Sequence, residues 1–212
     1  MADFKLHCFA QSGNAYKAAL LLSLCEADWE PVFVDFFNGE ARSDAYKDVN
    51  EMGEVPVLTH GKTRLTQSGV MLDYLSKHFG KFGPATEEER LEINRWLFWD
   101  NHKLTANIAT SRFMLNFVPE EKRNADIIAF LLSRAKGAMG ILEARLEGRD
   151  WIATDQLSIA DLSCVGYMYY LDELDIDAAR DFPNIARWKD AISALPGWKH
   201  PYDMMPGHPL EG

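Results

Sequence analysis

The chain has 212 residues, which is enough for one large domain or two small ones with a sizeable core. Its hydrophobic fraction of 47% and charged fraction of 25% are ordinary for a globular protein and exclude general disorder. The formal net charge of −10 repels the phosphates of nucleic acids and anionic lipids, so we expect neither nucleic acid nor membrane as a partner.

The cysteines and the amino-terminal residues indicate the cellular compartment. Cys8, Cys25 and Cys164 are odd in number and lack the spacing of a disulfide framework, which fits a reducing environment. Residues 1–14 contain no basic stretch followed by a long apolar run, so we expect no signal peptide. The sequence also lacks a CxxC pair and a Cys/His cluster of metal-ligand type. We therefore expect a cytoplasmic protein without a metal.

The first eighty residues alternate between strand-like and helix-like patterns. Strands are predicted where β-branched and aromatic residues gather, and helices where alanine and leucine occur without breakers. The strand–helix–strand start predicts a right-handed crossover between parallel strands, and a turn at His60-Gly61 adds an antiparallel hairpin. In chain order, the predicted elements are a strand over 4–9, a helix over 15–26, a strand over 31–37, a weak helix over 42–49, strands over 56–60 and 62–66, and a helix over 68–79.

The composition changes after a predicted linker that contains Gly80, Gly83 and Pro84. No strand is expected beyond it, so we predict an α/β domain over 1–80 and an all-helical domain over 86–212. The helix starts rest on capping boxes and on proline at first-turn positions. They are Thr86 with Glu89 for a helix to about Asn116, Pro119 for a helix to about Gly148, Ser158 with Asp161 for a third helix, and Pro183 for the last one, before an extended tail over 206–212.

The turn after the first predicted strand carries the first candidate chemical group. Ser12, Gly13 and Asn14 lie where the first helix begins. Unpaired backbone N–H groups and the positive end of the helix dipole suit an anion there, and a hydroxyl can donate a hydrogen bond to a thiolate. The alternative is that Ser12 or Asn14 is only the N-cap of the helix.

A second candidate segment precedes the third predicted strand. Pro56 pushes Val55 into extended geometry and can open a strand, where its missing N–H is tolerated. If the Val55–Pro56 bond is cis, the chain turns sharply and frees the Val55 N–H and C=O to pair with a peptide-like ligand. An ordinary strand start is the alternative, and the sequence does not distinguish the two.

The third candidate segment is Gln67-Ser68-Gly69, between the last predicted strand and the helix over 68–79. Ser68 is the expected N-cap of that helix, and the helix start again offers an anion site. Capping alone is the simpler interpretation of this serine.

The order and spacing of these segments resemble the cytosolic glutathione transferase family over essentially the whole chain. The resemblance rests on Ser12-Gly13-Asn14 before a helix, on Met52–Leu58 (MGEVPVL), on Thr66–Gly69 (TQSG) and on Ser158–Asp161 (SIAD) in an all-helical second half. It implies a thioredoxin-like first domain with the order βαβαββα, followed by a helical domain that contributes the site for an electrophile. It also implies glutathione as co-substrate, no metal, and a homodimer.

The resemblance also implies roles for single residues. Val55, in the segment Glu54-Val55-Pro56, should pair through its main chain with the cysteinyl unit of glutathione. Ser68 should hold the glutamyl carboxylate and Gln67 the glutamyl amino end. Ser12 matches the hydroxyl of serine-type members, the theta-like and zeta-like classes. Asn14 is a second candidate, because some bacterial members use Asn or Thr in this turn.

The cysteine-type and tyrosine-type classes are not supported. The turn that holds a nucleophilic cysteine in cysteine-type members here contains Ser12, and Tyr16 lies inside the helix. Cys8 and Cys25 fall within a predicted strand and helix, where they are expected to be small buried groups. Disulfide exchange by a protein thiol is therefore not expected, although reduction through bound glutathione stays open.

The first long helix of the second half carries the candidate electrophile site. Trp99, His102 and Lys103 have the spacing that brings side chains to one side of an α-helix. The alternative is that the tryptophans belong to the core and the charged groups to a solvated face.

The activity expected from these residues is activation of the glutathione thiol for attack on an electrophile. Isomerisation or disulfide reduction with glutathione on the same fold is an alternative, and so is non-catalytic binding of apolar ligands. The sequence does not identify the electrophile.

Overall fold

The structure is a computed structural model that describes residues 2–210. Its contacts divide the chain into two compact units, one formed by Met1–Lys81 with Leu195–Gly212 and the other by Phe82–Ala194. The expected division assigned everything after residue 86 to the helical domain, whereas the segment that begins at Leu195 groups with the first unit.

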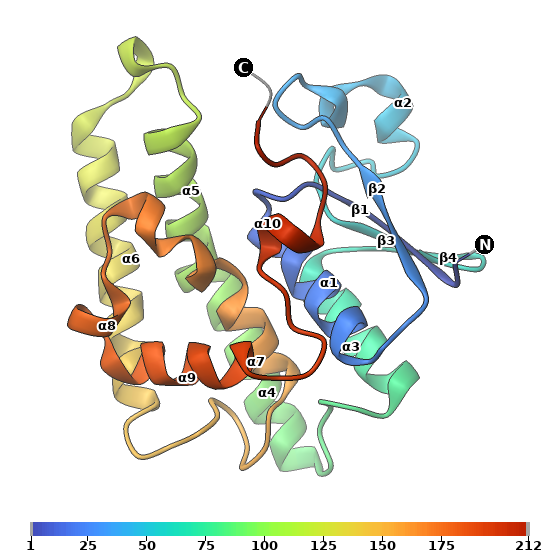
Figure 1. The fold of residues 1–212 in the computed structure, drawn as a ribbon, viewed down its shortest axis with the longest axis vertical. Coiled ribbons are helices and arrows are strands. Elements are labelled where there is room, and N and C mark those ends of the chain that lie inside the picture. The colour runs from blue at the N-terminus through green and yellow to red at the C-terminus, as the bar shows by residue number, and fades with distance from the viewer. Residues whose placement is uncertain (1, 211–212) are drawn as a thin grey trace. The chain divides into compact units, whose positions relative to one another are not determined.

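The first unit is built on a four-stranded sheet with the order β2-β1-β3-β4 (Figure 1). The strand β1 (Phe4–Cys8) pairs in parallel with β2 (Trp29–Phe33) and antiparallel with β3 (Val57–His60), which pairs antiparallel with β4 (Thr63–Thr66). The predicted mixed sheet is thereby confirmed. The second strand lies earlier than the predicted 31–37, because Trp29 and Glu30 pair with Phe4 and Lys5 and the chain turns after Val34.

Two helices of the first unit pack against each other and against the sheet. They are α1 (Gly13–Leu24), whose residues are nearly all buried, and α3 (Ser68–Phe79), whose bounds match the predicted ones. The weak helix predicted over 42–49 is instead a 3₁₀ turn, Glu40–Arg42, followed by α2 (Asp44–Lys47). Ser43 separates the two because it is extended and caps α2 by accepting from the Tyr46 N–H.

The carboxy-terminal residues run along α1 and include the short helix α10 (Pro201–Met204) (Figure 1). The Ser23 hydroxyl donates to the Gly197 carbonyl at 2.6 Å, and the Tyr16 hydroxyl donates to the Lys199 carbonyl at 2.9 Å. Within the tail predicted over 206–212, Pro206 and Gly207 accept hydrogen bonds from Ala10 and Gln11 of the first unit, and residues 211–212 lie outside the described residues.

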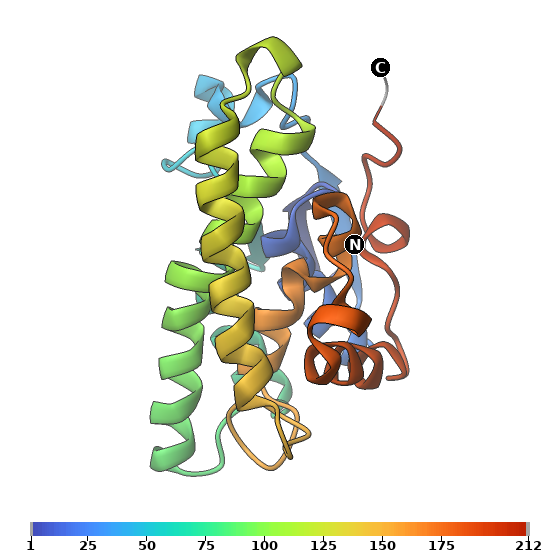
Figure 2. The same ribbon diagram turned by 90° about the vertical axis from the view of Figure 1, so that its left-hand side faces the viewer.

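The second unit is helical in its described residues, as predicted. Figure 2 shows its longest helix, α6, beside α5. The elements are α4 (Glu87–Trp99), a π-helical turn Asp100–Leu104, α5 (Thr105–Asn116), a 3₁₀ turn Glu120–Lys122, α6 (Ala125–Arg145), α7 (Ile159–Cys164), a 3₁₀ segment Val165–Leu174, α8 (Ala178–Asp181) and α9 (Pro183–Ser193).

Two predicted helices of this unit differ from the observed ones. The helix predicted from Thr86 to Asn116 is interrupted by the π-helical turn, where the fully buried Asp100 accepts hydrogen bonds from Thr105 and Ser163. The helix predicted to start at Pro119 starts at Ala125 instead, because Asn124 caps it with hydrogen bonds to two backbone N–H groups. Pro119 precedes only the short 3₁₀ turn.

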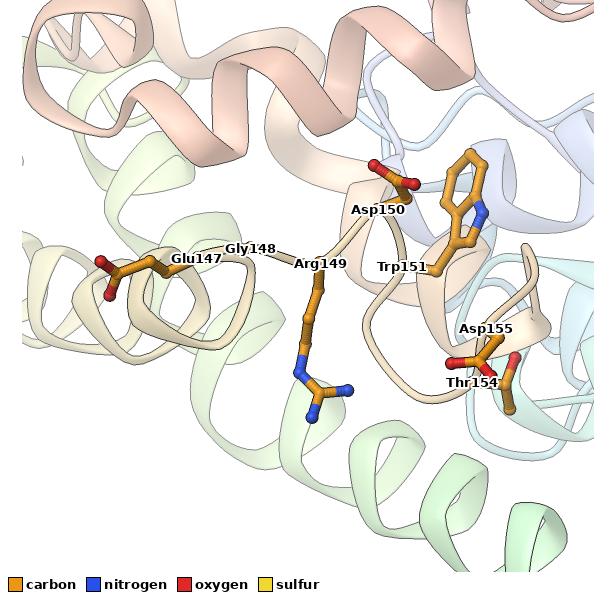
Figure 3. A pocket seen from close by; sticks show the side chains of 7 residues that line it. All are labelled: Glu147, Gly148, Arg149, Asp150, Trp151, Thr154 and Asp155. Atoms are coloured by element: carbon orange, nitrogen blue, oxygen red, sulfur yellow. The ribbon is translucent and has the colours of Figure 1, made fainter.

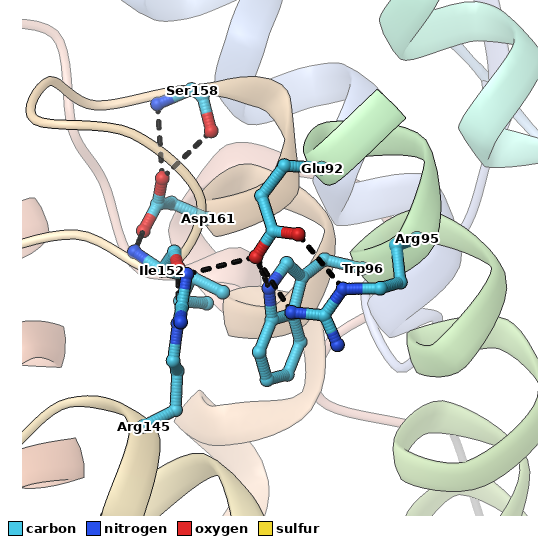
Figure 4. A network of polar contacts seen from close by, with 7 residues as sticks. All are labelled: Glu92, Arg95, Trp96, Arg145, Ile152, Ser158 and Asp161. Carbon is cyan, nitrogen blue, oxygen red and sulfur yellow. Dashed lines mark hydrogen bonds and ion pairs between the residues drawn. The ribbon is translucent and has the colours of Figure 1, made fainter. Parts of the chain in front are cut away.

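A polar network joins the helices of the second unit (Figure 4). The predicted capping box is present: Asp161, fully buried, accepts from the N–H and hydroxyl of Ser158 and also from the Ile152 N–H and the Trp188 indole. Burial raises the pKa of the Asp161 carboxyl, and the four donors oppose this. The network joins segments within the helical unit and contains none of the predicted site residues.

No helix among residues 2–210 combines the length and the apolar character needed to cross a bilayer.

Candidate functional site

Ser12 lies at the start of α1 and is its N-cap. Its hydroxyl oxygen accepts from the Ala15 N–H at 3.1 Å, and the residue is only 5% exposed. A hydroxyl that accepts a capping bond still has its own proton to donate. Capping and donation to a thiolate, which the sequence presented as alternatives, are therefore compatible at this residue.

Asn14 is the second residue of α1 and does not cap it. Its side-chain oxygen accepts a long hydrogen bond, 3.4 Å, from the Ser68 hydroxyl at the start of α3. This contact joins the two helix starts. Asn14 therefore bridges two predicted site segments.

The start of α3 differs from the prediction in one respect. Gln67 occupies the N-cap position and Ser68 is the first helical residue, because the Val70 and Met71 N–H groups bond to the Gln67 carbonyl. The predicted capping role of Ser68 is thus wrong. Gln67 has φ 65° and ψ 114°, a backbone conformation that non-glycine residues rarely adopt and that is concentrated at ligand sites.

The Gln67 side chain does not cap the helix either. Its amide nitrogen donates to the Glu54 carboxylate at 3.0 Å and lies 3.3 Å from the Met52 sulfur. The bond to a carboxylate fixes which end of the amide is the donor, since a carboxylate only accepts. The amide oxygen of Gln67 can therefore accept a hydrogen bond from another group.

The first two backbone N–H groups of α3 are hydrogen-bond donors at the candidate site. The N–H groups of Ser68 and Gly69 make no hydrogen bond with any other residue in the range 2–210. Ser68 is 8% exposed and Gly69 is half-buried. Two N–H groups without a partner among the described residues, a hydroxyl and the positive end of a twelve-residue helix are groups that suit an anion.

The segment before β3 is held by side chains from the preceding loop. The Glu54 carbonyl accepts from the Tyr46 hydroxyl at 3.1 Å and from the Asn50 amide at 2.8 Å. Gly53 is required there, because its φ is +63° and an added Cβ would lie 2.9 Å from the Ala41 carbonyl oxygen. Tyr46 and Asn50 were missed by the sequence analysis, since their role is to hold a backbone carbonyl and no motif marks it.

The Val55–Pro56 peptide bond is cis. No hydrogen bond joins the N–H or C=O of Val55 to another residue described in the structure. The pairing expected for a peptide-like ligand therefore has both of its partners available on this residue.

Sheet topology explains why these segments meet. The end of β1 pairs with the start of β3, His7 opposite Val57, and the start of β3 pairs with the end of β4, Val57 opposite Thr66. The three loops that follow β1, precede β3 and follow β4 therefore lie at the same edge of the sheet. The site residues that this edge brings together are Ser12, Asn14, Glu54, Val55, Pro56, Gln67 and Ser68, with direct contacts from Ser68 to Asn14 and from Gln67 to Glu54.

No protein thiol is placed for nucleophilic chemistry at this edge. Cys8 is fully buried, and burial raises the pKa of its thiol to about 12. Burial also raises the pKa of the Cys25 thiol, which lies at the far end of α1. Since the thiolate is the reactive form, both groups are unreactive near neutral pH.

No hydrogen bond, ion pair or ring contact joins the three residues predicted for the electrophile site, all of which lie among the described residues. Trp99 packs edge to face on Trp96 with ring centroids 5.0 Å apart, His102 is exposed, and Lys103 is half-buried. His102 and Lys103 fall in the π-helical turn, where the spacing that predicted a shared side of an α-helix no longer applies.

A polar cavity of about 470 Å³ lies in the loop between α6 and α7. Arg149 and Asp150 extend to opposite sides of this loop (Figure 3), and Asp150 pairs with Arg187 at 3.3 Å. The cavity is lined by Glu147, Gly148, Arg149, Asp150, Trp151, Thr154 and Asp155. It contains none of the predicted site residues. Within the described residues, no three His, Cys, Asp or Glu side chains form a group that could hold a metal ion.

Two family models match the chain. "Glutathione S-transferase, N-terminal domain" matches residues 2–77, and "Glutathione S-transferase, C-terminal domain" matches residues 106–196. The first match contains every residue gathered at the sheet edge, and the second lies within the helical unit except for its last two residues.

Similar proteins have been described from bacteria and plants. A structure from Rhodopseudomonas palustris described as a possible glutathione S-transferase is 31% identical, with a TM-score of 0.86, over 94% of this chain and 98% of that one. Glutathione S-transferase F14 of Arabidopsis thaliana is 28% identical over 93% of this chain and 83% of its own length. Disulfide-bond oxidoreductase YfcG of Escherichia coli is 24% identical over 89% of each. Because both halves match in order and a solved relative is similar over nearly its full length, this chain belongs to the glutathione S-transferase family.

Proposed function

We propose that the protein is a glutathione transferase that activates the glutathione thiol for attack on an electrophile. The observation that carries the proposal is the convergence, at one sheet edge, of the start of α1, the start of α3 and the unpaired Val55 backbone. These groups match a small anionic peptide, because they offer an anion site and a strand-like pair of backbone groups.

The binding roles follow from the hydrogen-bonding capacity of each group. The Ser68 hydroxyl, whose proton turns from Asn14 to the ligand, and the N–H groups of Ser68 and Gly69 hold the glutamyl carboxylate. The Gln67 amide oxygen accepts from the glutamyl ammonium, whose charge the adjacent Glu54 carboxylate also attracts. The N–H and C=O of Val55, beside Pro56, pair with the cysteinyl unit.

The chemistry consists of favouring the thiolate and presenting it to the second substrate. A free thiol has a pKa of about 8.5, so only a few per cent is ionised at neutral pH. The Ser12 hydroxyl and the start of α1 stabilise the negative sulfur. The thiolate then forms a carbon–sulfur bond with the electrophile. In a substitution, the leaving group departs with its electron pair. In an addition to an epoxide, the carbon–oxygen bond breaks and the released oxygen takes up a proton. Asn14 is the second candidate for the donor to sulfur.

The second substrate is proposed to bind at the helical unit, with Trp99, His102 and Lys103 as its first candidates. Of the three, Trp99 offers an apolar ring that is held in place, since it packs on Trp96 and is half-buried. A Trp99→Ala variant that changed KM for every electrophile by less than about twofold would remove it from the site. We further propose that the protein acts in the cytoplasm, as a homodimer and without a metal.

Reduction of disulfides through bound glutathione is the second candidate function. The relation to an oxidoreductase, YfcG, supports it at 24% identity. Because burial raises the pKa of Cys8 to about 12, this reaction would use the thiol of glutathione and not one of the protein. Turnover across halides, epoxides, peroxides and disulfides at fixed glutathione separates the two candidates and also separates an enzyme from a non-catalytic binder.

Calorimetric titration with glutathione tests the proposal directly. We expect binding by the wild type, and weaker binding by Ser68→Ala, by about tenfold for one charge-assisted hydrogen bond. Ser133→Ala, an exposed serine on α6, is the matched control and should bind as the wild type does. The absence of detectable binding at millimolar glutathione would refute the proposal.

A further inference from the structure

The carboxy-terminal segment reaches the loop that carries Ser12. Starting at Leu195, it follows α1 from its end toward its start, with contacts first at Ser23, then at Tyr16 (Figure 1). Beyond α10 it arrives at the residues between β1 and α1. Segments far apart in sequence thus meet directly before the candidate catalytic residue.

Two hydrogen bonds attach the segment to this loop. The Ala10 N–H donates to the Pro206 carbonyl at 2.7 Å, and the Gln11 side-chain nitrogen donates to the Gly207 carbonyl at 2.7 Å. Ala10 is fully buried and Gln11 is 4% exposed, whereas the acceptor residues Pro206 and Gly207 are half-buried. Within the loop itself, the Ser12 N–H donates to the Phe9 carbonyl at 3.0 Å.

Gly207 is suited to this close approach. Its φ is +89°, and an added Cβ would lie 2.6 Å from the Phe33 ring on β2. The next residue, His208, stacks on Tyr202 of α10 with ring centroids 3.7 Å apart. The backbone at Gly207 is therefore confined between β2 and the loop, with its carbonyl oxygen directed at Gln11.

We propose that Gln11 is a positioning residue, which uses its bond to the Gly207 carbonyl to hold the loop so that the Ser12 hydroxyl is directed at the glutathione sulfur. The inference rests on the proposed function. A hydrogen bond to sulfur weakens steeply as its angle departs from linear, and Ser12 follows Gln11 immediately in the chain. The Ser12 oxygen is already held from one side by the Ala15 N–H, so the loop before it sets the remaining freedom.

Two independent changes break the same bond. Gln11→Met keeps the length of the side chain and removes its donor. A chain ending at Pro206 removes the Gly207 carbonyl and turns that of Pro206 into a terminal carboxylate, which still accepts from the Ala10 N–H. The controls are Gln156→Met, an exposed glutamine of the helical unit, and a chain ending at Pro209. The readout is the ultraviolet titration of the bound thiol, together with the affinity for an S-alkylated glutathione.

We expect each change to raise the pKa of the bound thiol by about half a unit to one unit, which lowers the rate at pH 7 about three- to tenfold. The affinity for S-alkylated glutathione should stay within about twofold, since it has no thiolate to orient. Combining the two changes should raise the pKa by less than the sum of their separate effects, because both remove the bond from Gln11 to Gly207. An unchanged titration in folded Gln11→Met, or additive effects in the combined variant, would overturn the proposal.

The wild type separates this inference from the proposed function. If wild-type protein binds glutathione without lowering the pKa of the thiol, the proposed function fails. Amide hydrogen exchange over residues 9–14 then decides the positioning role without any activity measurement. Faster exchange in Gln11→Met than in Gln156→Met would support it, and equal exchange would refute it.

Discussion

The Ser12 hydroxyl can accept one hydrogen bond and donate another. Its oxygen accepts from the Ala15 N–H, and its proton remains available to a sulfur anion at the start of α1. Because the residue is nearly buried, water competes poorly for that proton. Removing the hydroxyl should therefore affect the thiol and the stability of α1 together, and the two effects must be measured separately.

Ser12→Ala should raise the pKa of bound glutathione by about one to two units, the equivalent of one charge-assisted hydrogen bond. Most activity should be lost at pH 7 and part of it recovered at pH 9, where the thiolate forms unaided. Ultraviolet absorbance of the complex against pH measures this directly. Thr86→Ala, which removes a capping hydroxyl at α4, controls for the capping loss of about 1 kcal/mol and should leave the titration unchanged.

The Asn14→Ala variant should behave differently from Ser12→Ala. Asn14 accepts from Ser68 and does not cap α1, so Asn14→Ala should weaken glutathione binding and leave the thiol titration unchanged. If the titration shifts in Asn14→Ala and stays in place in Ser12→Ala, the donor to sulfur is Asn14.

At the scale of elements, the start of α7 depends on one buried carboxylate. Asp161→Asn should lower the free energy of unfolding by about 3 kcal/mol, because an amide cannot accept from all four donors and some stay unpaired in the core. Urea unfolding measures the change. Asp155→Asn, an exposed acid of the preceding loop, should change it by less than about 0.5 kcal/mol. A loss of similar size in both variants would contradict the role of the capping box.

The helix α4 carries a carboxylate, Glu92, whose contribution to the free energy of unfolding depends on pH. The hydrogen bond from Arg95, with further contributions from Trp96 and Arg145, lowers the pKa of Glu92 to about 2 from its usual 4.5 (Figure 4). Since the folded-state pKa lies below the unfolded one, the ionised form stabilises the fold above about pH 4.5. That contribution is lost as the pH falls from there toward 2.

The difference in free energy of unfolding between wild type and Glu92→Gln should therefore be larger at pH 7 than at pH 3, where part of the contribution is already lost. Urea unfolding at both values tests this, with Glu88→Gln, an exposed acid on the same helix, as the control. A wild-type advantage that is equal at pH 7 and pH 3 would show that Glu92 does not act through its charge.

At the scale of the whole molecule, the proposed homodimer makes a prediction about exposed apolar side chains. The long helices of the second unit expose Phe98 (76%) and Phe130 (60%), among other apolar residues. We expect sedimentation to give twice the chain mass of 24.1 kDa at micromolar concentration. Phe98→Lys should shift the equilibrium toward monomer, whereas Leu210→Lys, outside these helices, should not. A wild type that sediments at 24.1 kDa would refute the dimer.

The sequence predicted what depends on local patterns. The mixed sheet, the bounds of α3, the all-helical second half and the Ser158–Asp161 capping box follow from residue periodicity and from caps that act within a few residues. The family and its expected site segments were also readable, because short motifs occur in a fixed order along the chain. Predictions were wrong where two residues near each other could both start a helix. Pro119 was expected to begin the helix, but Asn124 caps α6 instead.

Only the tertiary structure decided how these segments combine. Strand pairing brings together the segments that are joined by the bonds from Gln67 to Glu54 and from Ser68 to Asn14. The bond from the Tyr46 hydroxyl to the Glu54 carbonyl depends on how the loop between β2 and β3 folds. The attachment of the carboxy-terminal segment to Ala10 and Gln11 spans almost the whole chain. Such contacts leave no local pattern, because backbone carbonyls accept hydrogen bonds whatever their side chain, and their position is set by the packing of the complete fold.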